Sequence, residues 1–176
     1  MQVAAPGSTV VRGVTLIEAC IVLAILAVLA GTALPSFKET LKKRKFDGVS
    51  AEITTEVNFA RGVAVSQGRG TWLSYSRIPG GSCAIVHVGA KTDCTCASDG
   101  QPVCAPGSEA LKATLHPIAV SVAAPIRFDP TNGTVTPTAT IRVELNAGQE
   151  LHHRVNIMGR VRSCSPAGLV KGYPAC

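Results

Sequence analysis

The chain has 176 residues, and its 17 Lys and Arg against 11 Asp and Glu give a formal net charge of +6. This length excludes more than one sizeable compact domain once the apolar N-terminal stretch is set aside. The sequence contains no nucleophile elbow, zincin helix, phosphate-binding loop or dinucleotide fingerprint, so we expect neither an enzyme nor a cofactor.

The apolar run over residues 14–34 contains a single acid, Glu18. About 20 apolar residues cross the hydrocarbon of a bilayer, so the run predicts a transmembrane helix over residues 14–35. A carboxylate at the centre of such a helix costs about 2.5 to 3.5 kcal/mol. Cleavage after Gly13 would place the new ammonium of Val14 one helical turn from Glu18, and the two charges would neutralise each other. Glu18 also disfavours an ordinary secretory signal, and a plain membrane anchor remains an alternative.

The segment Gly13-Val14-Thr15-Leu16-Ile17-Glu18 resembles the class III signal of type IV prepilins and type II secretion pseudopilins. The resemblance implies that residues 1–13 are a leader, that a prepilin peptidase cleaves between Gly13 and Val14, and that Val14 is then methylated. It also implies other pilins as partners and a single-pass protein of the inner membrane.

Two features disagree about the side of the membrane on which the globular part lies. The basic run Lys42-Lys43-Arg44-Lys45 follows the apolar run and only Arg12 precedes it, so the positive-inside rule alone places the globular part in the cytoplasm. Six of the seven cysteines, all except Cys20, lie beyond the apolar run, and such an even set is typical of an exported disulfide framework. We give the cysteines and the prepilin signal more weight and expect a periplasmic domain. Whether the basic run contacts lipid or DNA stays open.

One long helix is predicted from residue 14 to about residue 67. In its second half, residues 36–69, apolar side chains recur at helical spacing and predict an amphipathic helix that packs on the domain. These side chains are Leu41, Val49, Ile53, Val57, Ala60 and Ala64. Gly68 and Gly70 flank Arg69 and are expected to end the helix.

Residues 70–176 predict a β-rich globular domain. Short β-prone runs cover residues 72–78, 84–88, 111–115, 118–122 and 125–128, and Asn132-Gly133 is a hairpin signal. The predicted fold class is therefore α+β, with a long N-terminal helix packed on an antiparallel sheet. The prepilin resemblance implies the same pilin-like fold.

Two neighbouring strands are predicted near residues 141–157. Ile141, Val143 and Leu145 alternate with polar residues, and Leu151, His153, Val155 and Ile157 form the next inward-facing set. Pairing of the two inward sets requires an odd loop of three or five residues around Ala147-Gly148. Arg154 then faces outward, and an unbroken strand would place Arg160 and Arg162 on the same face. A bulge at Gly159 would reverse that parity.

The cysteines predict disulfides rather than a metal site. The spacing of Cys94 and Cys96 does not match a zinc knuckle, so Cys83, Cys94, Cys96 and Cys104 are expected to form two disulfides. Three pairings remain open, and a bond between Cys94 and Cys96 is the least favoured. Cys164 is expected to pair with Cys176 and to contribute about 3 kcal/mol in the chain-entropy model. No metal is expected, because adjacent His152 and His153 on a strand point to opposite faces.

The C-terminal part is basic. From residue 151 onward the chain has Arg154, Arg160, Arg162 and Lys171 and no acid. Arginines at i and i+2 on an extended strand lie about 7 Å apart, close to the spacing of successive phosphates along a DNA strand. Guanidinium groups bind phosphate bidentately, and Gly159 permits close approach of the backbone.

The stretch Gly159-Arg160-Val161-Arg162, directly before Cys164, resembles the Gly-Arg-x-Arg motif of the FimT branch of the FimT/GspH family of minor pilins. Residues 58–65 and 126–133 also resemble that family. The resemblance implies a minor pilin at the pilus or cell surface that binds the phosphate backbone of DNA without sequence preference, for natural transformation. Arg160 and Arg162 would bind it, with help from Gly159, Arg154 and Lys171. The alternatives are a GspH-like pseudopilin of type II secretion and a structural minor pilin.

Overall fold

The computed structural model describes residues 15–146, 148–166, 168, 170 and 172–176. The expected leader over residues 1–13, the cleavage-site residues Gly13 and Val14, and Lys171 lie outside the described residues. The chain divides into two compact units, Met1–Arg44 and Lys45–Cys176. Helix α1, Leu16–Gln67, contributes residues to both.

In the first unit, α1 begins directly after Thr15. The hydroxyl of Thr15 accepts a hydrogen bond from the backbone N–H of Glu18 at 3.3 Å, as an N-cap residue does. Apolar side chains such as Leu16, Ile17 and Ile21 are exposed along this part of the helix. In the part of the chain that the structure describes, no helix combines the length and the hydropathy that crossing a membrane requires.

In the second unit, α1 buries one apolar stripe against the strands. The fully buried members of this stripe are Phe46, Val49, Ile53, Val57, Ala60 and Ala64. Their spacing of three or four residues repeats the helical period, so they line one face. Leu41, which the sequence pattern placed in the same stripe, is 49% exposed and belongs to the first unit.

The first sheet has five antiparallel strands in the order β5-β2-β1-β7-β8. These strands are β1 Thr71–Ile78, β2 Gly81–Val88, β5 Glu109–His116, β7 Ile126–Phe128 and β8 Val135–Thr136. The hydroxyl of Thr71 donates a hydrogen bond of 2.8 Å to the carbonyl of Ala60, which ties the start of β1 to α1.

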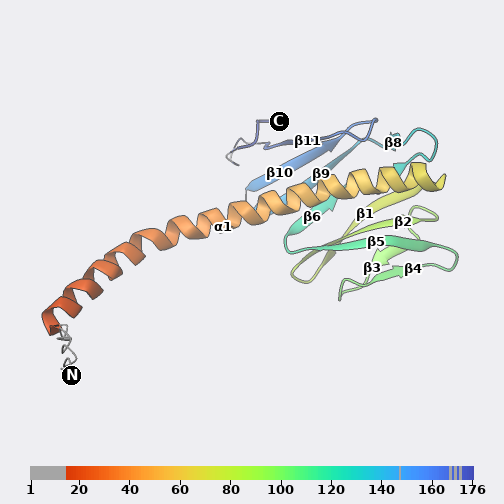
Figure 1. The fold of residues 1–176 in the computed structure, drawn as a ribbon. Coiled ribbons are helices and arrows are strands. Elements are labelled where there is room, and N and C mark those ends of the chain that lie inside the picture. The colour runs from red at the N-terminus through yellow and green to blue at the C-terminus, as the bar shows by residue number, and fades with distance from the viewer. Residues whose placement is uncertain (1–14, 147, 167, 169, 171) are drawn as a thin grey trace, which may run out of the picture. The chain divides into compact units, whose positions relative to one another are not determined.

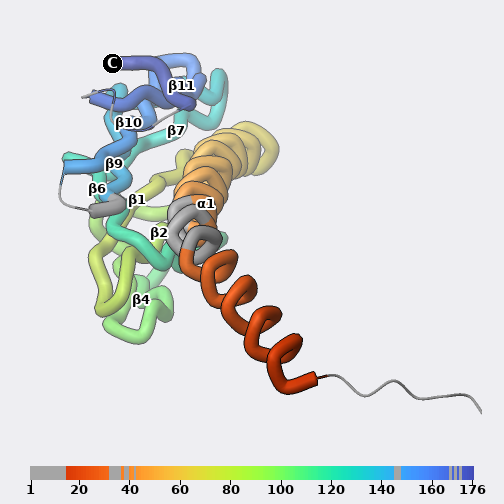
Figure 2. Tube along the Cα trace, turned by 90° about the vertical axis from the view of Figure 1, so that its left-hand side faces the viewer, coloured from red at the N-terminus to blue at the C-terminus, as the bar shows by residue number. Residues whose placement is uncertain are grey.

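The second sheet has four antiparallel strands in the order β11-β10-β9-β6. These strands are β6 Ala119–Val122, β9 Ala139–Asn146, β10 Gln149–Val155 and β11 Val161–Cys164. Figure 1 shows residues 45–67 of α1 lying across both sheets, and Figure 2 shows the strands on one side of that helix. One long helix packed on antiparallel β structure is the predicted α+β, pilin-like fold, which the structure confirms.

A small disulfide-bonded hairpin covers part of the other face of the first sheet. It consists of β3 Cys94–Cys96 and β4 Pro102–Cys104, in which Cys94 lies opposite Cys104. One disulfide joins Cys94 to Cys104 across the hairpin, and a second joins Cys83 of β2 to Cys96. Cys83, Ile85 and Cys94 form a second buried cluster there.

The hairpin predicted at Asn132-Gly133 has a longer loop than that dipeptide alone suggests. β7 and β8 pair antiparallel, with Phe128 opposite Val135. The carboxylate of Asp129 accepts hydrogen bonds from the backbone N–H groups of Thr131 and Asn132, and Gly133 has a φ of 64°. The backbone bonds to Asp129 lower the pKa of its carboxyl.

The connection between β9 and β10 reaches the expected pairing by a different route. Asn146 pairs with Gln149, but the register then shifts so that Glu144 pairs with Glu150, and Leu145 is the extra residue. The bulge restores the pairing of Val143 with Leu151 and of Ile141 with His153. Ile141 and Val143 therefore meet His153 and Leu151 as predicted, but Leu145 has no partner in the ladder. The predicted loop of three or five residues was wrong, because only residues 147 and 148 separate the two strands.

Candidate nucleic-acid interface

The arginines of the C-terminal part lie on a tight hairpin rather than on one unbroken strand. β10 ends at Val155, the chain reverses, and β11 begins at Val161, which pairs with Val155. Arg162 therefore lies directly opposite Arg154. The strand predicted to run to Ile157 ends at Val155, so the inward placement of Ile157 was wrong, and this residue is exposed. The unbroken strand through Arg160 and Arg162, which the sequence left open, does not occur.

Asn156 builds the turn of this hairpin. Its side-chain oxygen accepts hydrogen bonds from the backbone N–H groups of Met158 at 3.1 Å and Arg160 at 2.9 Å. Its backbone N–H donates to the carbonyl of Arg160, and its own carbonyl accepts from the N–H of Gly159. Short polar side chains commonly direct turns through such local bonds. The backbone before Arg162 is thus held in one conformation.

Gly159 is required in this turn on two grounds. Its φ is 73°, in the left-handed region that glycine adopts without steric cost. An added Cβ would also lie 3.2 Å from Cδ of Arg61, a residue of α1. The sequence predicted the close approach of a ligand at Gly159. In the structure, the group that lies close to Gly159 is the Arg61 side chain of α1.

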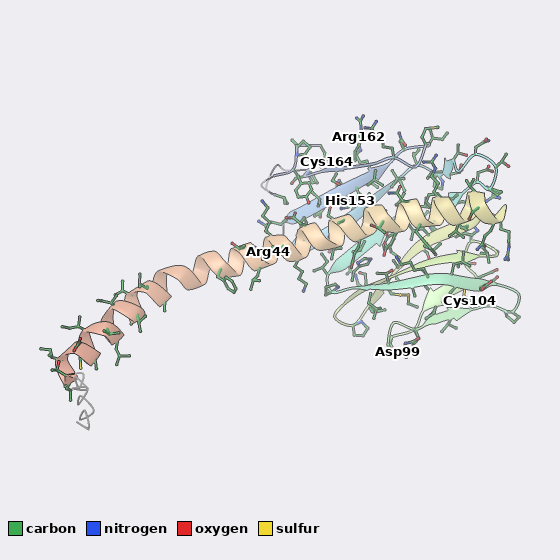
Figure 3. All side chains as sticks on the ribbon, viewed as in Figure 1. Arg44, Asp99, Cys104, His153, Arg162 and Cys164 are labelled. Atoms are coloured by element: carbon green, nitrogen blue, oxygen red, sulfur yellow. A yellow bond between two sulfur atoms is a disulfide. The ribbon has the colours of Figure 1, made fainter. Side chains whose placement is uncertain are left out.

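Four exposed arginines belong to this side of the second sheet, and we refer to them as the arginine cluster: Arg142, Arg154, Arg160 and Arg162. Arg142 pairs with His152 in the ladder, and His152 and Arg154 are alternate residues of β10, so Arg142 shares their outward face. The sequence showed Arg142 as outward-facing, but only the strand order places it next to β10. Figure 3 shows Arg162 on β11, with His153 nearer α1.

The acids of the same face are occupied elsewhere. Glu150 pairs with His152 at 3.1 Å, and Glu144 pairs with Arg77 at 3.5 Å. Among the described residues, no carboxylate lies within ion-pairing distance of the arginine cluster. Because like charges placed directly opposite each other on paired strands repel, this arrangement favours an external anion.

The chain after β11 folds back on the end of that strand. A disulfide joins Cys164 to Cys176, and Ser165 forms a parallel bridge with Ala175. The hydroxyl of Tyr173 donates to Asp47 at 2.8 Å, and its ring packs against the main core. Burial and the neighbouring Asp47 carboxylate raise the pKa of Tyr173. Tyr173 is the only Phe, Trp or Tyr from residue 151 onward, and its side chain is therefore engaged within the protein.

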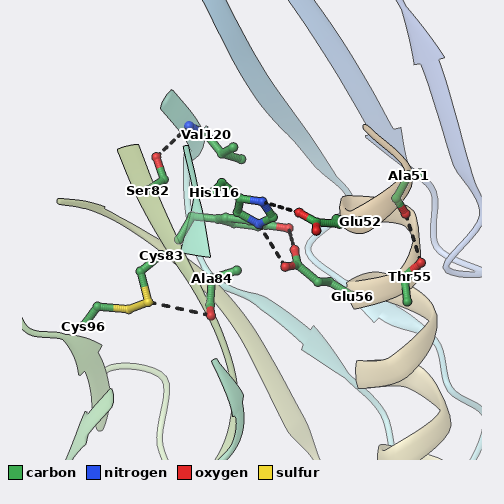
Figure 4. Close-up of polar contacts among 11 residues, drawn as sticks. Ala51, Glu52, Thr55, Glu56, Ser82, Cys83, Ala84, Cys96, His116 and Val120 are labelled. Carbon is green, nitrogen blue, oxygen red and sulfur yellow. Dashed lines mark hydrogen bonds and ion pairs between the residues drawn. A yellow bond between two sulfur atoms is a disulfide. The ribbon is translucent and has the colours of Figure 1, made fainter. Parts of the chain in front are cut away.

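An ionic network joins α1 to β5, and sequence reasoning did not identify it. His116 of β5 contacts Glu52 of α1 through Nδ1 at 3.1 Å and Glu56 through Nε2 at 2.9 Å (Figure 4). The hydroxyl of Tyr75 donates to the other oxygen of Glu56 at 2.7 Å. Since both ring nitrogens face carboxylates, the imidazolium is the form of His116 that can donate to both. The i, i+4 spacing of Glu52 and Glu56 was the only sequence signal.

The pKa shifts in this network follow from burial and charge. Burial acts to lower the pKa of His116, but the hydrogen bond and charge of Glu56, with those of Glu52, outweigh it and raise the pKa overall. Burial and the negative charge of Glu56 raise the pKa of Tyr75 well above its ordinary value. The network therefore favours the protonated form of His116 beside Glu56.

The remaining histidines do not converge on a site. His153 is buried, contacts the hydroxyl of Ser163 through Nδ1 at 2.8 Å, and has a pKa lowered to about 4 by burial and then by the charge of His152. His87 is also buried, and burial lowers its pKa. Within residues 15–176, apart from the positions excluded above, no group of three or more His, Cys, Asp or Glu residues could hold a metal ion.

Comparisons with known proteins connect the second unit to one family. A family model described as type II transport protein GspH matches residues 50–159. The match covers most of the helix that packs on the sheets and every strand except β11, and it stops one residue before Arg160. Comparisons with curated proteins and with solved structures gave no match.

Proposed function

Since the chain belongs to the GspH family, and is therefore a minor pilin or pseudopilin, we propose that it is a minor type IV pilin that binds DNA non-specifically for uptake in natural transformation. The observation that carries this proposal is the opposed pair Arg154 and Arg162, with Arg160 beside it, on a hairpin whose turn is held by Asn156.

The arginine cluster suits a phosphate backbone. Arg160 is the last residue before β11 and Arg162 lies two residues further on, so their Cα atoms are at most about 7 Å apart, and Arg154 adds a cation across the ladder. Each guanidinium forms bidentate bonds with phosphate oxygens. Neutralisation by phosphate also removes the repulsion between Arg154 and Arg162. Binding of this kind depends strongly on salt and weakly on sequence.

The chain reaches the place of binding as an anchored prepilin. We place the cleavage between Gly13 and Val14 by a prepilin peptidase, with Glu18 meeting the new ammonium and residues 14–35 held in the inner membrane. The domain then lies in the periplasm, and assembly with other pilins carries it to the pilus or the cell surface. An oxidising compartment agrees with the three disulfides of the domain.

Two further basic elements belong to the proposal in a secondary role. Lys171 lies in the sequence between Cys164 and Cys176, which a disulfide joins, and we propose it as a further cation for DNA. The basic run over residues 42–45 contacts either DNA or the anionic headgroups of the membrane. Weak binding by one subunit would be strengthened by several subunits in one fibre.

A salt titration of DNA affinity tests the proposal. The full chain in non-ionic detergent is compared with the variant Arg160→Gln/Arg162→Gln. A matched control, Arg77→Gln/Lys91→Gln, also removes two positive charges, one from β1 and one from the loop after β2. We expect the first variant to flatten the slope of log K against log salt by roughly 2 units. The control should keep the wild-type slope within about half a unit.

The second candidate function is a pseudopilin of a type II secretion system, which the description of the matching family favours. In that case the domain is structural and has no nucleic-acid ligand. If the wild-type chain does not bind DNA at low salt, or if both double variants lose the same affinity, the motif is not a DNA site and the pseudopilin becomes the better account.

A further inference from the structure

The turn between β10 and β11 exposes two apolar side chains at its tip. Ile157 is 57% exposed and Met158 is 56% exposed. They are adjacent in the sequence and stand between Arg154 at the end of β10 and Arg160 before β11. A single exposed apolar side chain is common on protein surfaces, but an adjacent pair flanked by arginines is a distinct chemical surface.

This tip is held rigidly by its backbone. The N–H groups of Met158, Gly159 and Arg160 all donate hydrogen bonds within the turn. The carbonyl of Ile157 accepts a bond of 2.8 Å from the backbone N–H of Val135 of β8, which fastens the turn to the first sheet. Because these bonds use the main chain and Asn156, the side chains of Ile157 and Met158 are not needed to form the turn.

A ligand for this tip must offer negative charge and an apolar surface at short range from each other. DNA offers both, since each phosphate is followed within one nucleotide by the flat face of a base. Isoleucine and methionine are among the side chains that proteins insert between base steps, where a duplex must first be unstacked at a cost of a few kcal/mol per step. An anionic membrane also combines charge with apolar groups, but the alternating arginines match the regular spacing of phosphates along a strand better than a fluid headgroup layer.

We propose that Ile157 and Met158 contact nucleobase faces of DNA whose phosphates are bound by the arginine cluster. This proposal rests on the proposed function and adds a preference to it. Base faces are free in single-stranded DNA and stacked in an intact duplex, so the tip favours single-stranded DNA or frayed ends. The arginines bind the phosphates of any DNA. The contact of the tip with bases makes binding to single-stranded DNA tighter than binding to the duplex.

The test uses the full chain in non-ionic detergent and three probes with the same number of phosphates: a single-stranded oligonucleotide, a duplex of half its length, and inorganic polyphosphate, which has no bases. The variant Ile157→Thr/Met158→Gln makes both side chains polar. Its matched control, Ile157→Val/Met158→Leu, keeps them apolar. We expect the polar variant to bind single-stranded DNA roughly tenfold more weakly, duplex less than about threefold more weakly, and polyphosphate as the wild type does.

Other outcomes separate the two proposals. If the polar variant binds all three probes like the wild type, the tip does not contact bases, although DNA binding by the arginines stands. An equal loss on all three probes, or a loss in the apolar control, shows a disturbed hairpin and overturns the base contact. If the polar variant instead loses affinity only for detergent micelles that contain an anionic phospholipid, added as a fourth probe, the tip contacts lipid and the base contact is overturned. If the wild-type chain binds neither form of DNA, the proposed function itself fails.

Discussion

Arg154 and Arg162 lie directly opposite each other on β10 and β11, and both side chains are exposed. Two guanidinium groups at opposed positions of an antiparallel pair repel each other. This arrangement lowers the stability of the free domain and raises its attraction for an anion. The stability of the domain and its affinity for DNA should therefore respond in opposite directions when one of the two arginines is removed.

The variant Arg162→Gln should melt roughly 1 to 2 °C higher than the wild type in low salt, because the repulsion from Arg154 is lost. Its affinity for DNA should fall, with a salt slope smaller by about one unit. Calorimetry and a binding titration measure the two effects. Arg77→Gln serves as the control, since it loses an ion pair and should neither gain stability nor lose affinity. A lower melting temperature for Arg162→Gln would show that its side chain supports the fold.

The variant Gly159→Ala should destabilise the domain more than Gly148→Ala does. Both glycines have a positive φ, 73° and 91°, so each substitution costs about 1 to 2 kcal/mol in backbone strain. Only at Gly159 does the new methyl group also meet Arg61, whereas nothing lies within 4 Å of the position at Gly148. Chemical unfolding with the disulfides intact measures the difference. Equal losses would mean that Arg61 moves aside without cost.

The two carboxylates that contact His116 should differ in their importance. The side chain of Glu56 is 2% exposed and that of Glu52 is 53% exposed. Glu56→Gln leaves a buried imidazolium without its closest counter-charge and should cost about 3 kcal/mol of unfolding free energy. Glu52→Gln removes a solvent-screened contact and should cost less than about 1 kcal/mol. Denaturant unfolding of the two variants at pH 6 tests this order, and a reversed order would contradict the proposed charge state of His116.

His116 should make the domain less stable as the solution becomes alkaline. Its pKa is raised in the folded state, so the folded chain binds the proton more tightly than the unfolded chain does. The resulting stabilisation is complete below the ordinary histidine pKa of about 6.5 and is lost as the pH rises through the folded value. The variant His116→Gln should lack this decline in unfolding free energy between pH 6 and pH 9. An unchanged pH profile would place the proton elsewhere.

His153 should act in the opposite direction. Its pKa falls from 6.5 to about 4 on folding, so the unfolded chain binds the proton more tightly. The stabilisation is complete above pH 6.5 and is lost as the pH falls toward 4, with a total of about 3 kcal/mol. The variant His153→Gln should lose less unfolding free energy than the wild type as the pH falls from 6.5 toward 4, which flattens this acid limb of the pH profile. Part of that limb should persist, because burial also lowers the pKa of His87. A limb of wild-type steepness would contradict the assignment.

The helix and most strands were predictable because their apolar residues repeat at the period of the element. Val49, Ile53 and Val57 follow the helical period, and Ile141 and Val143 the strand period. Each of these side chains is buried on the face that its spacing indicates. Such patterns report burial directly, and burial is what stabilises the element.

The reversal after β10 was not predictable from the same patterns. Val155 and Ile157 continue the alternation of Leu151 and His153, so the spacing favoured a longer strand. The turn depends on hydrogen bonds from the side chain of Asn156, which leave no trace in hydrophobic spacing. The bulge at Leu145 is hidden for the same reason, since it changes the pairing of two strands without changing either apolar pattern.

The candidate site was found in part. Arg160 and Arg162 were marked by their motif, and Arg154 by its outward position on a predicted strand. Arg142 joins them only through the order of β9 and β10 in the sheet. The contact of His116 with Glu52 and Glu56 joins residues about sixty positions apart, as the separations of 64 and 60 show. No local pattern encodes such a contact.

The contact of His116 with two successive turns of α1 fixes the rotation of that helix about its own axis. A purely apolar stripe could roll by a fraction of a turn and lose little, because hydrophobic contacts have no direction. Rolling α1 would instead separate Glu56 from His116 and leave both charges buried and unpaired. The rotation of residues 45–67 about the helix axis is thus set by charge. The same side of that helix therefore stays exposed, at a fixed orientation to the arginine cluster, for contact with other subunits.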